Sequence, residues 1–199
     1  MDKQGDEIKV ILLGESGVGK TNLINVFLGL GFDDSSTSSM GSNAFQGYFN
    51  YKDKKYLYCL WDTAGQEFCR AINKIFVRDA KIIILVYSID NRHSFEEINF
   101  WINFVKEIKE DDIYITALVA NKNDLFENQT VLDEEGNELA NKNNFEFLIT
   151  SALNDADGFR KFVFKLLAQY IEMTGENVNN KKGMKIKKIN DKNNKKKLC

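Results

Sequence analysis

The sequence predicts an α/β fold with a mostly parallel six-stranded sheet, one antiparallel edge pair, and helices on both faces. Two observations lead to this prediction. Strongly apolar runs alternate with helix-like stretches along the chain, and one segment contains two strand-like runs separated by only a tight turn. Such alternation is typical of a parallel sheet covered on both sides. A length of 199 residues with 43% hydrophobic residues suits one domain with a substantial core.

Strongly apolar runs predict the strands of the sheet. Apolar runs occupy residues 8–14, 56–62, 81–90, 113–121 and 145–151. The stretch 45–60 predicts two adjacent strands joined by a tight turn near Lys52 and Asp53, which supplies the antiparallel pair. The chain has no proline, so glycine and asparagine are expected to supply the turns. Ligands of such sheets bind beyond the carboxyl ends of the strands.

Three helices are predicted between and after these strands. The stretch 94–110 begins with a capping box formed by Ser94 and Glu97, and the stretch 157–173 closes the domain. Another helix is predicted at 20–30, with one apolar face formed by Leu23, Ile24, Phe27 and Leu30.

Charge is distributed unevenly along the chain. Residues 175–199 hold nine lysines and two acidic residues, a charge of +7, so the net charge of −2 leaves −9 for the rest. We therefore expect a folded domain at 1–174 and a disordered polybasic tail at 175–199. The tail is either a solvated end or a contact for an anionic membrane surface. An acidic body disfavours nucleic acid as a partner.

The sequence also indicates the cellular compartment of the chain. No apolar run is long enough to span a bilayer, and the N-terminal stretch is polar where a secretory leader needs an apolar region. We therefore expect a cytosolic chain. Cys59, Cys69 and Cys199 lack metal-ligand spacing and are expected to be reduced thiols, and the single histidine, His93, is expected at the surface.

The segment GESGVGKT at 14–21 directly follows the first apolar run and opens the first predicted helix. It fits the phosphate-loop pattern G-x-x-x-x-G-K-[ST] in the required strand–loop–helix context. Glycines let successive backbone N–H groups point at phosphate oxygens, and the helix N-terminus adds partial positive charge. Lys20 is expected to reach the β- and γ-phosphates, and the Thr21 hydroxyl to bind Mg²⁺. Kinases, ATPases and GTPases all use this loop.

Two further motifs indicate which nucleotide is bound. NKND at 121–124 and WDTAGQE at 61–67 both follow or end an apolar strand. Together with the phosphate loop, they resemble the Ras superfamily of small GTPases over residues 8–173, with the Rab branch as the nearest match. The resemblance implies a P-loop G domain that binds GTP and GDP with Mg²⁺.

The resemblance assigns roles around the base. Asp124 is implied to accept hydrogen bonds from guanine, Asn121 to fix the loop and contact N7, and the Lys122 stem to lie over the ring. Ser151, Ala152 and Leu153 stand where the family has S-A-K, with the Ala152 N–H aimed at guanine O6. Leu153 removes a lysine stem, so weaker nucleotide affinity is expected. Phe32 is implied to lie edge-on to the base; the alternative is a loop-anchoring phenylalanine.

The resemblance also assigns the phosphate and metal contacts. Thr21, Asp62 and Ser39 are implied to hold Mg²⁺, Asp62 through a water; Gly65 is implied to sense the γ-phosphate and Gln66 to orient the attacking water. Intrinsic hydrolysis is expected to be slow until a partner supplies an arginine. The remaining implied phosphate-loop contacts come from Gly14, Ser16, Gly17, Val18, Gly19, Lys20 and Asn22.

Ser39 lies in the hydroxyl-rich stretch SSTSSMG at 35–41, eighteen residues after Thr21, where the family places its second hydroxyl ligand. Ser38 is the rival position. Serine lacks the methyl group that restricts threonine, so a looser loop is expected. Residues 40–44, MGSNA, and 76–80, FVRDA, differ from the Rab pattern at positions that face effectors.

The C-terminus is a candidate lipidation site. The chain ends KKKLC, with Cys199 as the last residue, so it is not a C-a-a-X box. One prenyl group together with a polybasic arm would supply two membrane signals.

The sequence thus predicts a monomeric Rab-like switch, reversibly bound to the cytosolic face of a membrane, with an exchange factor, a GTPase-activating protein and effectors as partners. The alternatives are a guanine-nucleotide-binding scaffold with negligible hydrolysis, a non-Rab switch of the same superfamily, and, less favoured, a P-loop ATPase or kinase.

Overall fold

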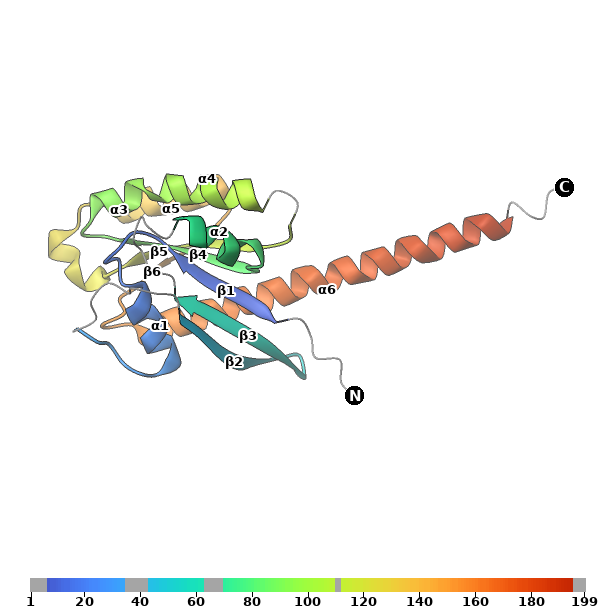
Figure 1. Ribbon diagram of the computed structural model, residues 1–199, viewed down its shortest axis with the longest axis horizontal. Helices are drawn as coiled ribbons and strands as arrows, with labels where there is room; N and C mark the ends of the chain where they lie inside the picture. Colours follow the sequence, from blue (N-terminus) through green and yellow to red (C-terminus); the bar gives the residue numbers. More distant parts are fainter. Residues whose placement is uncertain (1–6, 35–42, 63–69, 110–111, 195–199) are drawn as a thin grey trace.

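The computed structural model describes residues 7–34, 43–62, 70–109 and 112–194. Its six-stranded sheet has the order β2-β3-β1-β4-β5-β6, and only the edge pair β2–β3 is antiparallel (Figure 1). The predicted sheet is confirmed. The strands are β1 Ile8–Leu13, β2 Asn43–Tyr51, β3 Lys54–Asp62, β4 Ile82–Ser88, β5 Ile115–Asn121 and β6 Glu146–Ile149.

Helices cover both faces of the sheet, as predicted. Helices α1 and α6 pack on one face, and α2, α4 and α5 pack on the other (Figure 1). Sequence analysis missed α2, α5 and the short 3₁₀ helix η2. Helices α5 and η2 contain few apolar residues, whereas α2 has an amphipathic pattern that was overlooked. The helices are α1 Lys20–Leu28, α2 Arg70–Arg78, α3 Arg92–Glu96, α4 Ile98–Ile108, η2 Asn123–Asn128, α5 Asp133–Asn143 and α6 Ala156–Asn194.

The central strands are apolar on both sides because each side faces a different helix layer. Along β1, Val10 and Leu12 pack against the α1–α6 layer, while Ile11 and Leu13 pack against the opposite layer, and all four are fully buried. Strands β4 and β5 repeat this alternation. Two separate cores therefore fix the central strands from both sides and hold their carboxyl ends in place.

The predicted turn between β2 and β3 is confirmed. Lys52 and Asp53 have φ values of 45° and 60°, and Tyr51 pairs with Lys54 across the two-residue loop. Positive φ at both central residues matches the twist of the flanking strands. The tip of this hairpin contacts α6, where the Glu172 carboxylate accepts hydrogen bonds from the Tyr51 hydroxyl and the Lys52 ammonium.

Two local predictions are wrong. Leu30 is 70% exposed, because α1 ends at Leu28 and Gly29 turns the chain in a left-handed conformation. Ser94 does not cap the helix predicted at 94–110: Asn91 caps α3 by accepting a hydrogen bond from the Ser94 N–H. The buried Ser94 hydroxyl instead accepts from the Ser88 N–H at the end of β4.

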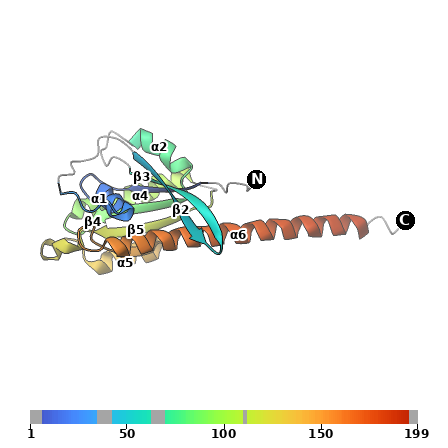
Figure 2. The same ribbon diagram turned by 90° about the horizontal axis from the view of Figure 1, so that it is seen from below.

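Helix α6 continues beyond the predicted end of the domain. The sequence predicts a disordered tail from residue 175, whereas the structure has one helix from Ala156 to Asn194 that projects from the body (Figures 1 and 2). No proline interrupts this stretch. A helix nucleated on the core then gains one hydrogen bond for each residue added. None of the helices in the described ranges is long and apolar enough to cross a membrane.

The glycine of α5 provides a test of packing. A Cβ atom on Gly136 would lie 2.3 Å from the Tyr87 hydroxyl oxygen and 2.6 Å from the Phe147 ring. We expect Gly136→Ala to lower the free energy of unfolding by about 1–3 kcal/mol because these rings must move. Urea unfolding measures the loss.

The matched control is Gly175→Ala in α6, where a Cβ atom would meet nothing within 4 Å. Alanine should raise helix stability there by about 0.5–1 kcal/mol. Equal effects of the two substitutions would contradict the packing at α5.

Candidate functional site

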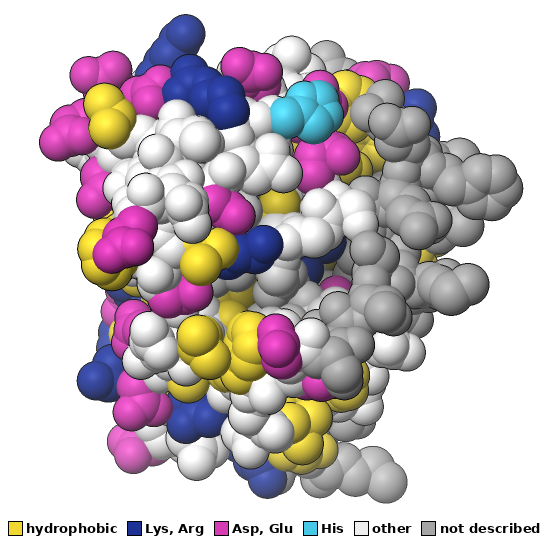
Figure 3. All heavy atoms as spheres, turned by 90° about the vertical axis from the view of Figure 1, so that its left-hand side faces the viewer, with side chains coloured by type: hydrophobic (Ala, Val, Ile, Leu, Met, Phe, Trp, Pro, Cys, Tyr) yellow, Lys and Arg dark blue, Asp and Glu magenta, His cyan; other side chains and the backbone are white. Residues whose placement is uncertain are grey.

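The carboxyl ends of the parallel strands meet at one edge of the sheet, and the predicted motifs gather there. Residue 14 follows β1, Asp62 ends β3, Asn121 ends β5, and Ser151 follows β6 by two residues. This edge is the left side of Figure 1, and Figure 3 views it directly. Hydrophobic side chains gather near the centre of that face, among acidic and polar ones. The site is therefore built from segments far apart in sequence.

The loop between β1 and α1 follows a path that only glycine permits. A Cβ atom on Gly14 would lie 2.1 Å from the Val86 carbonyl oxygen, and one on Gly19 would lie 2.4 Å from the Asn121 Nδ2 atom. Gly17 and Gly19 have left-handed φ values of 76° and 95°. These conformations cost a side-chain-bearing residue free energy that glycine avoids. The loop can therefore lie against β4 and β5 while its backbone stays open to a ligand.

Lys20 lies folded over this loop. Its ammonium donates to the Gly14 and Glu15 carbonyl oxygens, each at 2.8 Å, and the residue is only 6% exposed. Burial lowers the pKa of Lys20 to about 8, although the Asp62 and Glu15 carboxylates oppose that shift. A cation held here, at the N-terminus of α1, suits an anionic ligand.

Thr21 and Asp62 meet beside Lys20. The Thr21 hydroxyl donates to the Asp62 Oδ2 atom at 2.8 Å, and Asp62 is 1% exposed. A hydroxyl and a carboxylate oxygen at the mouth of a phosphate loop are the donor types that Mg²⁺ prefers. Within the described ranges, no group of three or more His, Cys, Asp and Glu side chains could hold a metal, so the fit rests on this pair and on the phosphates of a nucleotide.

Asn121 joins the phosphate loop to the loop after β6. Its amide nitrogen donates to the Val18 carbonyl oxygen at 2.8 Å, and its amide oxygen accepts from the Ala152 N–H at 3.2 Å. The side chain is 1% exposed. The sequence-implied role of fixing the loop has a geometric basis here, whereas the Ala152 N–H, implied to contact a base, donates to Asn121 in this structure.

Asp124 and Ser151 form a second link across the site. The Ser151 hydroxyl donates to Asp124, and its oxygen accepts from the N–H groups of Leu153 and Asn154, both at 3.1 Å. Lys122 adopts a left-handed conformation with φ 64°, which turns the chain between β5 and η2. Hydrogen bonds therefore link residues 121–124 to residues 151–153.

Asn22 was predicted as a phosphate-loop contact, and the structure gives its side chain another role. Its side chain makes two hydrogen bonds to the backbone of Asp33, at 3.0 and 2.9 Å, and so fixes the segment next to Phe32. Arg160 of α6 was missed: it donates to the carbonyl oxygens of Val26 and Phe27 at the end of α1. No local pattern predicts the contact of Asn22 with Asp33 or that of Arg160 with α1.

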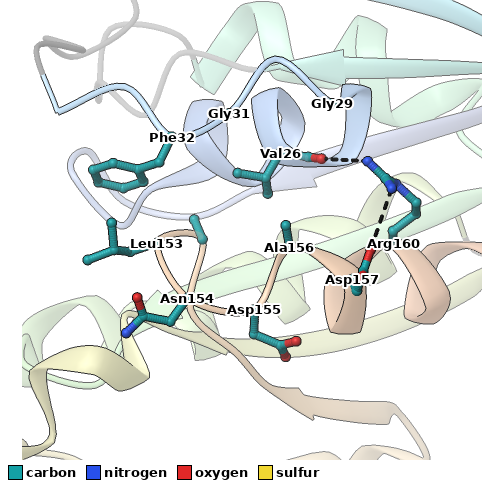
Figure 4. Close-up of a pocket in the computed structure, with 11 residues that line it drawn as sticks. Val26, Gly29, Gly31, Phe32, Leu153, Asn154, Asp155, Ala156, Asp157 and Arg160 are labelled. Carbon is teal, nitrogen blue, oxygen red and sulfur yellow. Dashed lines mark hydrogen bonds and ion pairs between the residues drawn. The ribbon is translucent and has the colours of Figure 1, made fainter.

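A groove opens between the segment after α1 and the loop after β6. It has a volume of about 520 Å³, and Phe32 and Leu153 lie near each other at one end, while Asp157 and Arg160 lie at the other (Figure 4). Phe32 is 41% exposed and Leu153 is 53% exposed.

Ser16 and Val18 lie in the described phosphate loop. Ser39, Gly65, Gln66 and Cys199 lie outside the described residues, so their predicted roles stay predictions.

Comparison with known proteins agrees with this geometry. The family model described as the Ras family matches residues 9–172. The chain is 36% identical over 162 residues to the Ras-related protein Rab-2B of Dictyostelium discoideum, and the match covers 80% of each chain. The chain therefore belongs to the Ras superfamily of small GTPases, near the Rab branch.

The buried ammonium of Lys20 predicts a pH dependence. Between pH 8 and 10.5, the unfolded chain holds a proton on this lysine that the folded, nucleotide-free chain does not. The unfolding free energy should therefore rise with pH in this window, by up to about 1.4 kcal/mol per pH unit. Comparing chemical unfolding of the wild type and Lys20→Met at pH 8 and 10 isolates this contribution. Identical pH profiles would contradict it.

The bridge at Asn121 predicts a large effect of an isosteric change. Asn121→Asp places a carboxylate oxygen against the Val18 carbonyl oxygen in a buried site, so we expect a loss of about 2–4 kcal/mol in unfolding free energy. Asn50→Asp, at an exposed position of β2, is the matched control and should stay within about 0.5 kcal/mol of the wild type. Similar losses of unfolding free energy in both variants would mean that the Asn121 hydrogen bonds stabilise the fold no more than an exposed asparagine does.

Proposed function

We propose that this member of the Ras superfamily is a GDP/GTP switch that regulates vesicle trafficking at a membrane through GTP-dependent effector binding. The observation that carries the proposal is the Asn121 bridge, which holds the phosphate loop and the base loops in one unit. A nucleotide bound across that unit would place its phosphates at Lys20 and its base near Asp124. The 36% identity to the Ras-related protein Rab-2B supports the Rab-like part of this proposal.

Base selection follows from the Asp124 carboxylate. Ser151 orients this carboxylate through a hydrogen bond and is itself held by backbone N–H groups. Guanine offers N1–H and an N2 amine to such an acceptor pair, and adenine does not. An adenine base would leave a desolvated carboxylate without partners, which disfavours ATP strongly.

Phosphate binding uses groups that are already in position. The Lys20 ammonium would exchange the Gly14 and Glu15 carbonyl oxygens for phosphate oxygens. Thr21 and Asp62 would hold Mg²⁺, which, when bound, neutralises charge on the β- and γ-phosphates. Gln66 would orient the attacking water, and Ser39 and Gly65 would contact the γ-phosphate or its metal. Hydrolysis is slow until an activating protein adds an arginine.

Membrane attachment is proposed to involve the C-terminal region. Helix α6 projects from the body (Figure 1), and the sequence after it contains three lysines and Cys199. A prenyl group on Cys199 and nearby lysines would supply hydrophobic and electrostatic attachment to an anionic cytosolic membrane face. An exchange factor and effectors complete the proposed cycle.

Single-turnover hydrolysis tests the proposal. The wild-type chain with Mg²⁺ should hydrolyse GTP slowly and leave ATP intact, and Gln66→Leu should lower the GTP rate by at least about tenfold because the attacking water is no longer oriented. Gln169→Leu is the matched control, since Gln169 lies on α6 and bonds Glu146.

The outcomes separate the candidate functions. GTP binding without turnover in either protein would favour the scaffold, and ATP turnover would refute guanine selection. Loss of turnover in Gln169→Leu would show that the assay reports folding rather than catalysis.

A further inference from the structure

Arg160 of α6 reaches across the groove to the end of α1 (Figure 4). Its Nη2 atom donates to the Val26 carbonyl oxygen at 3.1 Å, and its Nε atom donates to the Phe27 carbonyl oxygen at 3.2 Å. The last carbonyl oxygens of a helix have no partner inside it and carry partial negative charge. Helix α1 has no basic residue in its own last turn. Arg160 therefore supplies, from another helix, the cation that the end of α1 lacks.

The chain leaves α1 through a glycine turn at residues 29–31. Gly29 and Gly31 have left-handed φ values of 79° and 84°, and Leu30 between them is 70% exposed. Glycine has more conformational freedom than any other residue, so such a turn costs much entropy to hold in one conformation. The Gly29 N–H donates to the Val26 carbonyl oxygen at 3.1 Å, and this oxygen also accepts from Arg160. Arg160 thus holds the atom at which the glycine turn begins.

Arg160 joins the two walls of the groove. Gly29 and Gly31 line the wall formed by the segment after α1, and Ala156 lines the wall formed by the start of α6 (Figure 4). Arg160 follows Ala156 by four residues in α6 and donates to the opposite wall. The walls therefore cannot move apart at this end of the groove without breaking its hydrogen bonds to α1.

The groove adjoins the proposed nucleotide site, because its lining includes Ala152, whose N–H donates to Asn121. We propose that Arg160 is a positioning residue that keeps the walls of the groove together around a bound nucleotide and so slows nucleotide release. This inference rests on the proposed function. A nucleotide held between the phosphate loop and the loop after β6 leaves faster when the walls separate more often. Each separation breaks charge-assisted hydrogen bonds of Arg160, which are stronger than those between neutral groups.

The two carbonyl contacts, rather than the neighbouring ion pair, are expected to carry this effect. Arg160 also lies 3.5 Å from the Asp157 carboxylate, but the Asp157 side chain is 79% exposed and the Arg160 side chain is 38% exposed. An ion pair this open to water contributes little. A planar guanidinium can donate to two carbonyl oxygens at once, whereas a lysine ammonium lacks that fixed fork. Lysine should therefore replace Arg160 only in part.

Release of a fluorescent GDP analogue tests the proposal. The full chain is loaded with the analogue and Mg²⁺, and excess unlabelled GDP is added. Arg160→Met should release the analogue about tenfold faster, the size expected for the loss of a charge-assisted hydrogen bond, and Arg160→Lys should lie between Arg160→Met and the wild type. Lys161→Met removes the same charge from the next, exposed position of α6 and should match the wild type. Asp157→Asn should stay within about twofold of it.

Hydrogen exchange of the GDP-bound chain separates this role from a general loss of stability. The Gly29 amide is bonded to the Val26 carbonyl oxygen, so it should exchange faster in Arg160→Met than in the wild type. The amides of β4, which lies in the centre of the sheet, should exchange at the wild-type rate. Local opening of the groove changes the first rate alone, whereas global unfolding would change both.

The contradicting outcomes are distinct. Wild-type release from Arg160→Met, or equally fast release from Lys161→Met or Asp157→Asn, would overturn the role of Arg160 and leave the proposed function standing. Faster exchange in β4 as well as at Gly29 would also overturn it, because the substitution would then act on the whole fold. A wild-type chain that retains no GDP analogue would overturn both the role of Arg160 and the proposed function.

Discussion

The buried amide of Asn121 is the interaction on which the site depends. One side chain donates to the phosphate loop and accepts from the loop after β6, so two segments about 130 residues apart are held at a fixed separation. Its burial strengthens both hydrogen bonds and makes the loss of either one costly. Gly19 has no side chain where this amide passes, and the close approach of Gly14 to β4 seats the same loop. Gly14, Gly19 and Asn121 thus act together to fix the position of the phosphate loop.

This constraint separates the rigid part of the site from the parts that the nucleotide completes. Lys20 already donates to two backbone carbonyl oxygens, and the Thr21 hydroxyl donates to Asp62. On the proposed function, a bound nucleotide would exchange these internal hydrogen bonds for contacts with its phosphates and metal. Order–disorder transitions in the two segments that sense the γ-phosphate are the usual means of switching in such proteins. The anchored side chains around the base would then set nucleotide affinity, and the side chains that change partners at the phosphates would respond to the nucleotide state.

The sequence predicted the sheet well because burial on both sides produces continuous apolar runs, as in β4, where all seven residues are buried. The phosphate loop and NKND were found because their chemistry requires fixed residue types at fixed spacing. Local signals failed where tertiary contacts decide the outcome. Ser94 has the sequence of a cap, but its hydroxyl serves β4, and Leu30 fits the helix period but follows the residue that ends the helix. Asn22 and Arg160 act on backbone atoms distant in sequence, which no pattern within a single segment can encode.

Equilibrium competition between GDP and ADP tests whether the Asn121-linked loops form a guanine-nucleotide site. GDP and ADP would each displace a fluorescent GDP analogue from the wild-type chain in the presence of Mg²⁺. GDP should compete on the order of 10⁴-fold more strongly than ADP, because only guanine satisfies the carboxylate of Asp124. Equal competition by GDP and ADP would contradict it.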